Sequence, residues 1–417
     1  MKIIEEVLKI IDFFSIACMI YYVVIGLCSL RKSKNETDSK NFKKFACIIP
    51  ARNEELVIEN LLESLKKQNY PKEFYDIFVI PNNCTDNTEM ISKQQKVKII
   101  NCENVRTNSK GDVLRHVFKV LKNEDYEAYI IFDADNVVHP NFIKKMNNIL
   151  NKGYRLAQGY RDSKNPSDTW ISSTSSLHYM VQNYFVNKAR MNISQSSFIN
   201  GTGFMISKEL IEEKGYNSLT MTEDIELTVK CALDKEKIAF VEEAITYDEQ
   251  PIKFSESWKQ RKRWSVGTIQ CLKMYSKSLK NDIIKNKNFG ALDSLLFLFA
   301  PYMQLLTTAI FLLHILTNVV ETLEINFISK IFFSIMWYIL SILMSILLVK
   351  INKKDIKRYL KGIFTLPLFY FSWIPINIIA CFKKNLKWEK IEHTRTISFN
   401  NILSLSYLSN GVKHEKG

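Results

Sequence analysis

Two aspartates that follow an apolar run could perform chemistry in this sequence. Asp133-Ala134-Asp135 comes directly after Tyr129–Phe132. Carboxylates two residues apart in extended chain point to the same side. At a strand end they could hold one hard divalent cation together with diphosphate oxygens. The competing interpretation is an acidic turn, where aspartate is common, but Pro140 soon afterwards indicates that a helix follows the strand end.

A second acidic group, Thr222-Glu223-Asp224, precedes the helical pattern Ile225–Leu233. Threonine or aspartate at this place is typical of a helix N-cap, whose side chain accepts from free backbone amides. Taken alone, the group favours this cap over a catalytic role.

The third group is Gln260-Arg261-Lys262-Arg263-Trp264. On a helix, residues 260, 263 and 264 share a face that offers an amide, a fixed cation and an aromatic plate. Arginine suits a diphosphate because its fork donates two parallel hydrogen bonds, and tryptophan suits the face of a sugar ring. An amphipathic helix at a membrane surface would have the same composition, and one helix can serve both purposes.

The elements around these groups predict an α/β fold. Apolar runs predict strands at Phe45–Ile49, Tyr75–Ile80, Val97–Asn101 and Tyr129–Phe132, with helices at Glu54–Lys67 and Lys110–Lys122. Strands that alternate with helices favour a mostly parallel sheet with helices on both sides. Ligands of such sheets bind beyond the carboxyl ends of the strands, which is where the first aspartate pair falls.

The order of the motifs resembles the processive, membrane-bound family-2 glycosyltransferases, such as the synthases of cellulose, hyaluronan, chitin-like chains and poly-N-acetylglucosamine. A strand ends near Asn53, a Thr85-Asp86 turn follows, and the DxD, TED and QxxRW groups come in sequence. The runs Gln158–Asp162 and Gly201–Phe204 are also similar to bacterial members. The resemblance covers roughly residues 45–270, extends to the membrane layout, and implies a nucleotide-binding domain of the GT-A type.

The resemblance assigns roles to individual residues. Asp133 and Asp135 should bind Mg²⁺ or Mn²⁺ and the donor diphosphate, and Asp224, beside Glu223, should be the catalytic base. Other expected donor-binding residues are Pro50, Ala51, Asn53, Glu54, Asn82, Lys110 and Arg263, of which Arg263 should hold the leaving diphosphate. Gln260 and Trp264 should line the acceptor site, with Thr202 and Gly203 near the transferred sugar.

One departure from the family pattern concerns the nucleotide base. Family members usually carry an aspartate before the Thr-Asp turn, and here Asn82 stands at that place. An asparagine carbonyl can still accept from a uracil N–H, although it brings no charge. A UDP-linked donor remains the expectation.

The implied reaction is a single displacement that inverts the anomeric carbon, and no Ser-His or Cys-His arrangement indicates an enzyme nucleophile. The leading hypothesis is elongation of a polysaccharide at the membrane. The alternative is transfer of one sugar to a lipid. A non-catalytic subunit that binds nucleotide or polymer is a third possibility, indicated by Asn82 alone.

Four uncharged stretches are long enough to cross a bilayer: Phe13–Leu30, Ser294–Val320, Ile331–Val349 and Gly362–Phe382. The first lacks a basic leader and a cleavage pattern, which favours a signal anchor. Pro367 and Pro375 weaken the last as a regular helix. We therefore expect an anchor over 8–30, a glycosyltransferase domain over 43–255, an interfacial segment over 256–290, spans over 291–320 and 331–350, a transmembrane or re-entrant segment over 361–382, and a basic tail over 383–417.

The net charge of +14 is distributed along membrane edges. Lysine and arginine follow the first, third and fourth apolar stretches, whereas the loop between the second and third carries Glu321 and Glu324. Basic loops mark the cytoplasmic side, so we expect a multi-pass protein of the cell membrane with a cytoplasmic catalytic domain. This distribution favours membrane lipids over nucleic acid as a partner. The eight cysteines form no CxxC pair, which argues against a zinc site or a disulfide framework.

Overall fold

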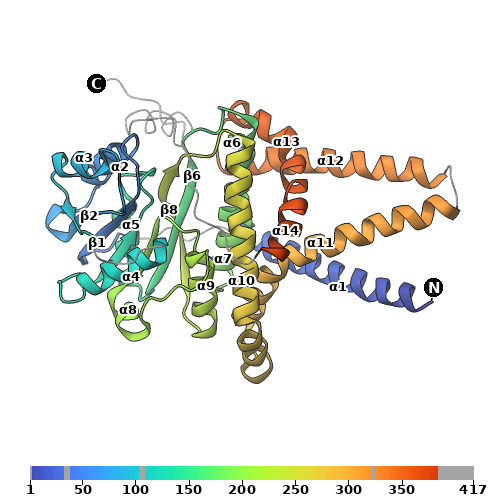
Figure 1. Ribbon diagram of the computed structural model, residues 1–417, viewed down its shortest axis with the longest axis horizontal. Helices are drawn as coiled ribbons and strands as arrows, with labels where there is room; N and C mark the ends of the chain where they lie inside the picture. The colour runs from blue at the N-terminus through green and yellow to red at the C-terminus, as the bar shows by residue number, and fades with distance from the viewer. Residues whose placement is uncertain (1, 32–37, 103–108, 322–324, 384–417) are drawn as a thin grey trace.

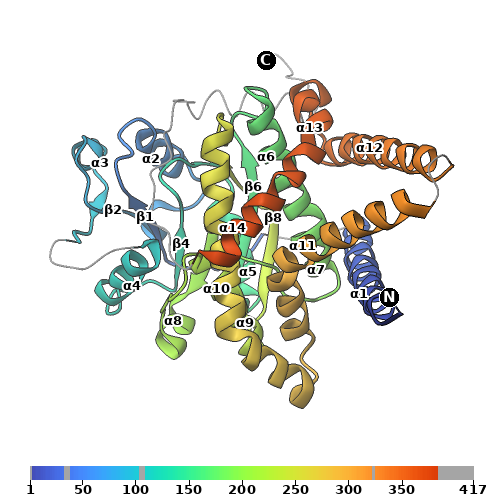
Figure 2. The same cartoon turned by 45° about the vertical axis from the view of Figure 1, so that its right-hand side comes forward.

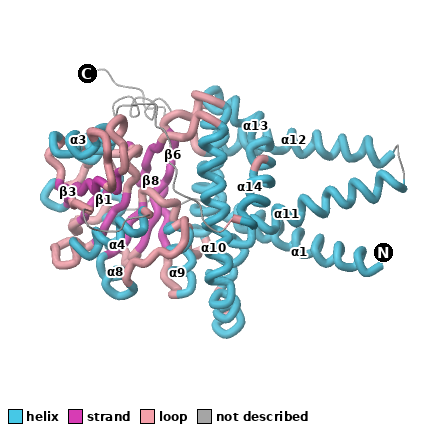
Figure 3. Tube along the Cα trace, in the orientation of Figure 1, coloured by secondary structure: helices cyan, strands magenta, loops and turns pink. Residues whose placement is uncertain are grey.

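The computed structural model describes residues 2–31, 38–102, 109–321 and 325–383. A sheet domain forms one side of the molecule, and three long helices project from the other side (Figure 1). A layer of helices lies between the two, as the secondary-structure colouring of Figure 3 makes plain.

The sheet has eight strands in the order β3-β2-β1-β4-β7-β6-β8-β5. Their bounds are β1 Phe45–Ala51, β2 Tyr75–Pro81, β3 Lys98–Ile99, β4 Ala128–Ile131, β5 Val137–Val138, β6 Leu156–Ser163, β7 Phe204–Ser207 and β8 Ile238–Asp248. β1 runs parallel to β2 and β4, β2 to β3, and β6 to β8. β7 is antiparallel to β4 and β6, and β5 to β8. The mostly parallel sheet is confirmed, and its antiparallel part was not predicted.

Helices cover both faces of this sheet because successive side chains of a strand point to opposite sides. Phe45, Cys47 and Ile49 of β1 join one core, whereas Ala46 and Ile48 join the other. The helices of the sheet domain are α2 Ile58–Lys66, α3 Thr88–Gln94, α4 Lys110–Val120, α5 Phe142–Asn151, α8 Lys208–Lys214 and α9 Glu223–Leu233. Apolar side chains of α2 and α5 fill the first core, and those of α4 fill the second.

The middle layer contains α6 Trp170–Val181, a π-helical turn at Gln182–Lys188, α7 Ala189–Asn192, α10 Phe254–Asn286, α13 Leu360–Phe371 and α14 Trp373–Phe382. The helix α10 carries most of the predicted interfacial segment. The fourth apolar stretch breaks at Ser372, because Pro375 has no N–H for the carbonyl of Phe371. Of its two helices, α13 packs against α6 and α14 packs against α10 (Figure 2), and both run across the direction of the projecting helices (Figure 1). Whether this stretch crosses the membrane or re-enters stays a prediction.

The projecting helices are α1 Lys2–Leu27, α11 Phe289–Glu321 and α12 Ile325–Ile351. Within the described residues, four helical segments are long and apolar enough to cross a membrane: Ile11–Leu30, Phe289–Leu313, Ser334–Ile351 and Ile356–Phe382. These match the four predicted stretches. The helix α1 begins well before residue 8, and of the predicted basic tail all but residue 383 lies outside the described residues.

A buried ion pair joins three parts of the chain where the projecting helices meet the middle layer. Arg190 of α7 donates from Nε to Asp293 Oδ2 and from Nη2 to Asp293 Oδ1, both at 2.7 Å. Tyr21 of α1 donates to the same carboxylate at 2.7 Å. The side chains of Arg190 and Asp293 are only 2% and 5% exposed, so removal of either charge leaves the other buried and uncompensated.

Replacing Asp293 by alanine is therefore expected to destabilise the protein by about 3–5 kcal/mol. The matched control is Tyr21→Phe, which removes one hydrogen bond to the same carboxylate and should cost about 1 kcal/mol. Thermal unfolding in detergent would compare the two. Equal melting temperatures for Asp293→Ala and wild type would show that the ion pair does not hold the helices together.

Candidate active site

A cavity of about 900 Å³ lies between the carboxyl ends of the central strands and the middle layer of helices. Its walls combine two sets of residues, which we name the donor end and the membrane end. The donor end includes Pro50, Ala51, Glu54, Asn82, Lys110, Asp133, Asp135, Glu223, Asp224 and Arg263. The membrane end includes Phe297, Ala300, Pro301, Gln304, Tyr370, Trp373 and Asn377. Most residues predicted from the motifs thus line one cavity.

Asp133 and Asp135 lie in the loop directly after β4, and hydrogen bonds from neighbouring residues fix the position of this loop. Thr202 Oγ1 accepts from the backbone N–H of Asp133 at 2.8 Å and donates to Asn136 Oδ1 at 2.5 Å. The ammonium group of Lys110, at the start of α4, pairs with the Asp133 carboxylate and donates to the Gly201 carbonyl at 2.7 Å. A fixed cation thus already lies beside this carboxylate.

The residues at this end fit a hard divalent cation that is shared with the substrate. Asp133 and Asp135 both line the cavity, and carboxylate oxygens are the ligands that Mg²⁺ and Mn²⁺ prefer. Among the described residues, no group of three or more His, Cys, Asp or Glu side chains is arranged to hold a metal. The protein would therefore supply a partial ligand set, to be completed by diphosphate oxygens and water, as is common for Mg²⁺ with nucleotides.

The second acidic group forms the first turn of α9. Thr222 occupies the N-cap position but makes no side-chain capping bond, while Asp224 Oδ1 accepts from the Ile225 N–H at 2.9 Å. Burial raises the pKa of both Glu223 and Asp224, and the positive charges of Lys110 and Arg263 oppose that rise. A carboxylate with a raised pKa is a stronger base than one in water. The expected simple N-cap is therefore not what the structure shows.

These pKa shifts predict where kcat/KM for sugar transfer falls on the acid side of its pH profile. A base acts when deprotonated, so if Asp224 is the base, as the family resemblance implies, activity should be present above its pKa and lost as the pH falls through it. Because that pKa is raised, the limb should lie above the ordinary aspartate value of about 3.9. Glu223→Gln removes the adjacent negative charge, so it should move the limb of kcat/KM to lower pH. A limb that moves upward, or does not move, would contradict this electrostatic account.

The QxxRW residues extend into the cavity from α10. Gln260, Arg263 and Trp264 line it together. The Trp264 ring lies 6.5 Å from the ring of His178 at an interplanar angle of 20°. Arg261 points elsewhere, because it is buried and donates to the Phe369 carbonyl at 3.1 Å and to Ser372 Oγ at 2.6 Å. One arginine of this motif, Arg263, therefore lines the cavity, whereas Arg261 binds the chain at the break between α13 and α14.

Three predicted site residues lie outside the lining of the cavity and support its walls. Asn53, with φ of 58°, accepts at Oδ1 from the Thr85 N–H at 2.7 Å and ties together the loops after β1 and β2. Thr202 is fully buried behind Asp133. Gly203 has φ of 61°, and a Cβ there would lie 2.8 Å from Thr246 Cγ2. Direct contact of these residues with substrate stays a prediction.

The site also contains residues to which sequence reasoning gave no role. Arg161 donates to Asp248 Oδ2 from Nε at 2.8 Å and from Nη2 at 2.7 Å, and its guanidinium lies 4.1 Å over the Tyr179 ring. Burial raises the pKa of Asp248 to about 6 despite this pairing. The run Gln158–Asp162 was the available clue to Arg161. His178 and Tyr179 belong to a helix that carries no recognisable motif.

Comparisons with known proteins agree with this architecture. Residues 43–267 match the family model described as Glycosyltransferase like family 2. The chain is 24% identical over 381 residues to the probable glycosyltransferase YdaM of Bacillus subtilis, covering 85% of this chain and 87% of that protein. It is 25% identical over 262 residues to the beta-monoglucosyldiacylglycerol synthase of a Nostoc species, covering 61% of this chain and 55% of that protein. The chain thus spans about half the length of this second relative.

A solved structure resembles nearly the whole molecule. The mannosyltransferase PcManGT from Pyrobaculum calidifontis, in complex with GDP-Man and Mn²⁺, aligns with a TM-score of 0.61 at 14% identity, covering 91% of this chain and 98% of that chain. At this identity the likeness concerns the fold. The fold and the motifs together define a glycosyltransferase of the GT-A type. The chain belongs to glycosyltransferase family 2, as its resemblance to that family predicted.

Proposed function

We propose that this protein transfers a sugar, with inversion and with the help of a divalent metal, from a nucleotide-sugar donor to a hydroxyl group of a membrane lipid. One observation carries the proposal: a single cavity joins the Asp133–Asp135 pair, the Asp224 carboxylate and Arg263 to a wall made of membrane helices. The named relatives and the solved neighbour are consistent with nucleotide-sugar transfer.

Three charged residues at the donor end, Lys110, Arg263 and Asp224, have chemical tasks in this proposal. Negative charge grows on the diphosphate as the bond to the anomeric carbon breaks, and Lys110 and Arg263 stabilise that charge. A bound Mg²⁺ or Mn²⁺ would add positive charge against the same oxygens. Asp224 accepts the proton of the attacking hydroxyl. Because attack comes from the side opposite the leaving group, the anomeric configuration inverts.

Asn82 bears on the nucleotide of the donor. Asn82 lies at the donor end, where its backbone N–H donates to the Ala51 carbonyl at 2.8 Å and its side-chain Oδ1 accepts from Asn83 Nδ2 at 3.2 Å. Its amide can accept from a uracil N–H without adding charge. We therefore propose a UDP-linked sugar, while the solved neighbour carries GDP-Man.

The second candidate is elongation of a polysaccharide, which Trp264 favours because an indole plate in the acceptor region can stack on a sugar ring. Product analysis separates the two candidates. Purified protein is incubated with radiolabelled donor in lipid vesicles, and the products are resolved by chain length and by organic extraction. A single extractable glycolipid supports the lipid acceptor, whereas a ladder of water-soluble chains supports the polymer.

The proposed location follows from the same features. Basic residues flank the apolar segments on the side of the sheet domain, and basic loops stay in the cytoplasm. We propose a cytoplasmic catalytic domain that draws its donor from the cytoplasm and its acceptor from the cell membrane. A non-catalytic role has little support, because the acidic residues expected for catalysis all line the cavity.

A further inference from the structure

The membrane end of the cavity carries polar groups on helices that are otherwise apolar. Asn377 of α14 donates from Nδ2 to Gln304 Oε1 of α11 at 2.7 Å and accepts at Oδ1 from Ser265 Oγ of α10 at 2.7 Å. Gln304 Nε2 donates to the Tyr370 carbonyl at 3.1 Å. Polar side chains within membrane helices are costly, and they usually mark a substrate site when they face the protein interior.

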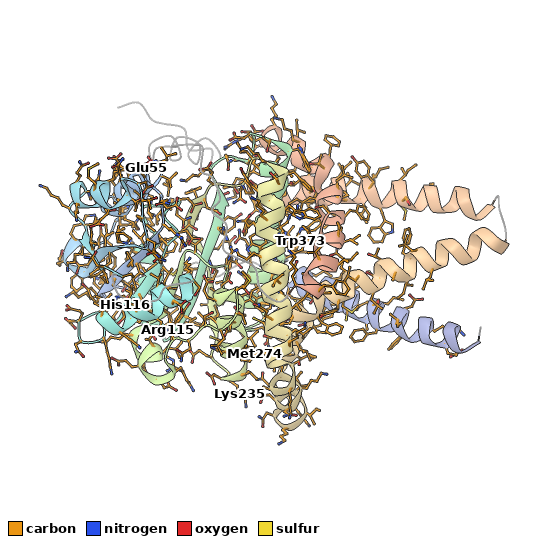
Figure 4. All side chains as sticks on the ribbon, in the orientation of Figure 1. Glu55, Arg115, His116, Lys235, Met274 and Trp373 are labelled. Carbon is orange, nitrogen blue, oxygen red and sulfur yellow. The ribbon has the colours of Figure 1, made fainter. Side chains whose placement is uncertain are left out.

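A buried donor in the same place lacks an acceptor. The indole Nε1 of Trp373 is shielded from solvent and has no hydrogen-bond partner among the described residues. Its ring lies 5.8 Å from that of His178 and 6.4 Å from that of Trp264, and it lines the cavity. Figure 4 shows Trp373 on α14, between the sheet domain and the projecting helices. A buried N–H without an acceptor is unfavourable, so a ligand oxygen is the expected partner.

The apolar helix α11 forms part of the wall of the cavity. Ala300 lines the cavity and is itself exposed. Pro301 follows it, and its ring cannot donate to the carbonyl of Phe297, which also lines the cavity. Further along the same apolar helix, Phe311 and Leu312 are exposed. The small side chain beside a proline marks this position as the place where the wall would open to the acyl chains of a lipid.

We propose that this opening is a lateral entrance for a membrane lipid with a hydroxylated headgroup, and that Trp373, Gln304 and Asn377 bind that headgroup. This inference rests on the proposed function and adds the route and the residues that select the acceptor. One headgroup oxygen accepts from the indole N–H, and the other polar groups of the headgroup hydrogen-bond to the side-chain amides of Gln304 and Asn377. The acyl chains lie against α11. The bound hydroxyl gives its proton to Asp224 and forms the glycosidic bond as the bond to the diphosphate breaks.

Two substitutions test the proposal in phosphatidylcholine vesicles that contain diacylglycerol, phosphatidylglycerol or monoglucosyldiacylglycerol as acceptor. Trp373→Phe keeps an aromatic ring but removes the N–H, which forms no bond to the described part of the protein. Its KM for the lipid should rise about tenfold, with a smaller change in the KM for the donor. Ala300→Trp should block the opening and raise the lipid KM at least as much. Leu312→Trp, on the same helix away from the cavity, is the matched control and should behave as wild type.

The outcomes separate this inference from the proposed function. A lipid KM that is unchanged in Trp373→Phe and Ala300→Trp would overturn the entrance and leave lipid glycosylation standing. Glycosylation of none of the three lipids, with elongation of a soluble oligosaccharide, would overturn the lipid acceptor but not nucleotide-sugar transfer. Absence of nucleoside diphosphate release from every donor would instead count against the proposed function itself.

Discussion

Replacement of Asp224 by asparagine is expected to lower the rate of sugar transfer by about 10² to 10⁴, the usual contribution of a general base. The amide has nearly the shape of the carboxylate and can still accept from the Ile225 N–H, so the start of α9 should keep its structure. What disappears is the ability to take a proton. Steady-state rates at saturating donor, measured with the best acceptor, would give the loss.

Two further measurements make the Asp224 result specific. Binding of UDP to the variant should stay close to that of wild type, because the loss concerns proton transfer. Asp234→Asn, at the exposed end of the same helix, makes the identical chemical change and should leave the rate unaffected. If Asp224→Asn retained the wild-type rate, the proton acceptor would have to be sought elsewhere.

A glycine outside the motifs should matter nearly as much as the motif residues. Gly267 lies on α10, one turn beyond Arg263 and Trp264, where the helix packs directly on Thr222. A Cβ at this position would lie 2.5 Å from Thr222 Cγ2 and closer still to Oγ1. In Gly267→Ala, α10 must therefore move away from the loop that carries Asp224. Since displacement of a site by about 1 Å can cost roughly 10²-fold in rate, we expect a loss of that order in kcat/KM.

The expected loss of activity in Gly267→Ala has a steric cause, which a second substitution at Thr222 can test. Thr222→Ala removes the two closest atoms, Oγ1 and Cγ2, and leaves only Cβ at 2.9 Å, so Thr222→Ala/Gly267→Ala should regain part of the activity relative to Gly267→Ala. Ser278→Ala, at an exposed position of the same helix, should have no effect. A double variant less active than either single variant would contradict the close packing of α10 on this loop.

The contact between Gly267 and Thr222 is one of several that join the QxxRW helix α10 to the acidic group Thr222-Glu223-Asp224. Gln270 Oε1 accepts from the Met221 N–H at 3.0 Å, and Tyr275 donates to Glu226 Oε1 at 2.8 Å. Both bonds join α10 to the loop and helix of the acidic group. The spacing of Asp224 and Arg263, the proposed base and the proposed ligand of the leaving diphosphate, thus depends on side chains to which the proposal gives no chemical role.

Local patterns predict those parts of the fold that local interactions determine. The strands β1, β2 and β4 and the helix α4 are predicted to within a few residues, because short apolar runs and helical spacing are properties of adjacent residues. The pairing of β7 between β4 and β6 depends on partners far apart in the chain, which no local pattern specifies. For the same reason β3, predicted at five residues, is paired over only two.

The same distinction between local and long-range features applies to the residues of the candidate site. Asp133, Asp224 and Arg263 belong to recognisable motifs, so the amino-acid sequence by itself indicates them. Gln304, Trp373 and Asn377 come from apolar stretches whose individual polar residues have meaning only when the helices are packed together. The fold brings the two sets into one cavity, and only the packed helices reveal a membrane end.

The most direct test of the central claim is release of nucleoside diphosphate by the purified protein in detergent. A panel of nucleotide sugars would be assayed with Mn²⁺ or Mg²⁺ and again with a chelator. We expect release from one preferred donor, abolished by the chelator and by Asp224→Asn. Release that persisted in full with the chelator, or in Asp224→Asn, would contradict metal-assisted transfer with Asp224 as the base.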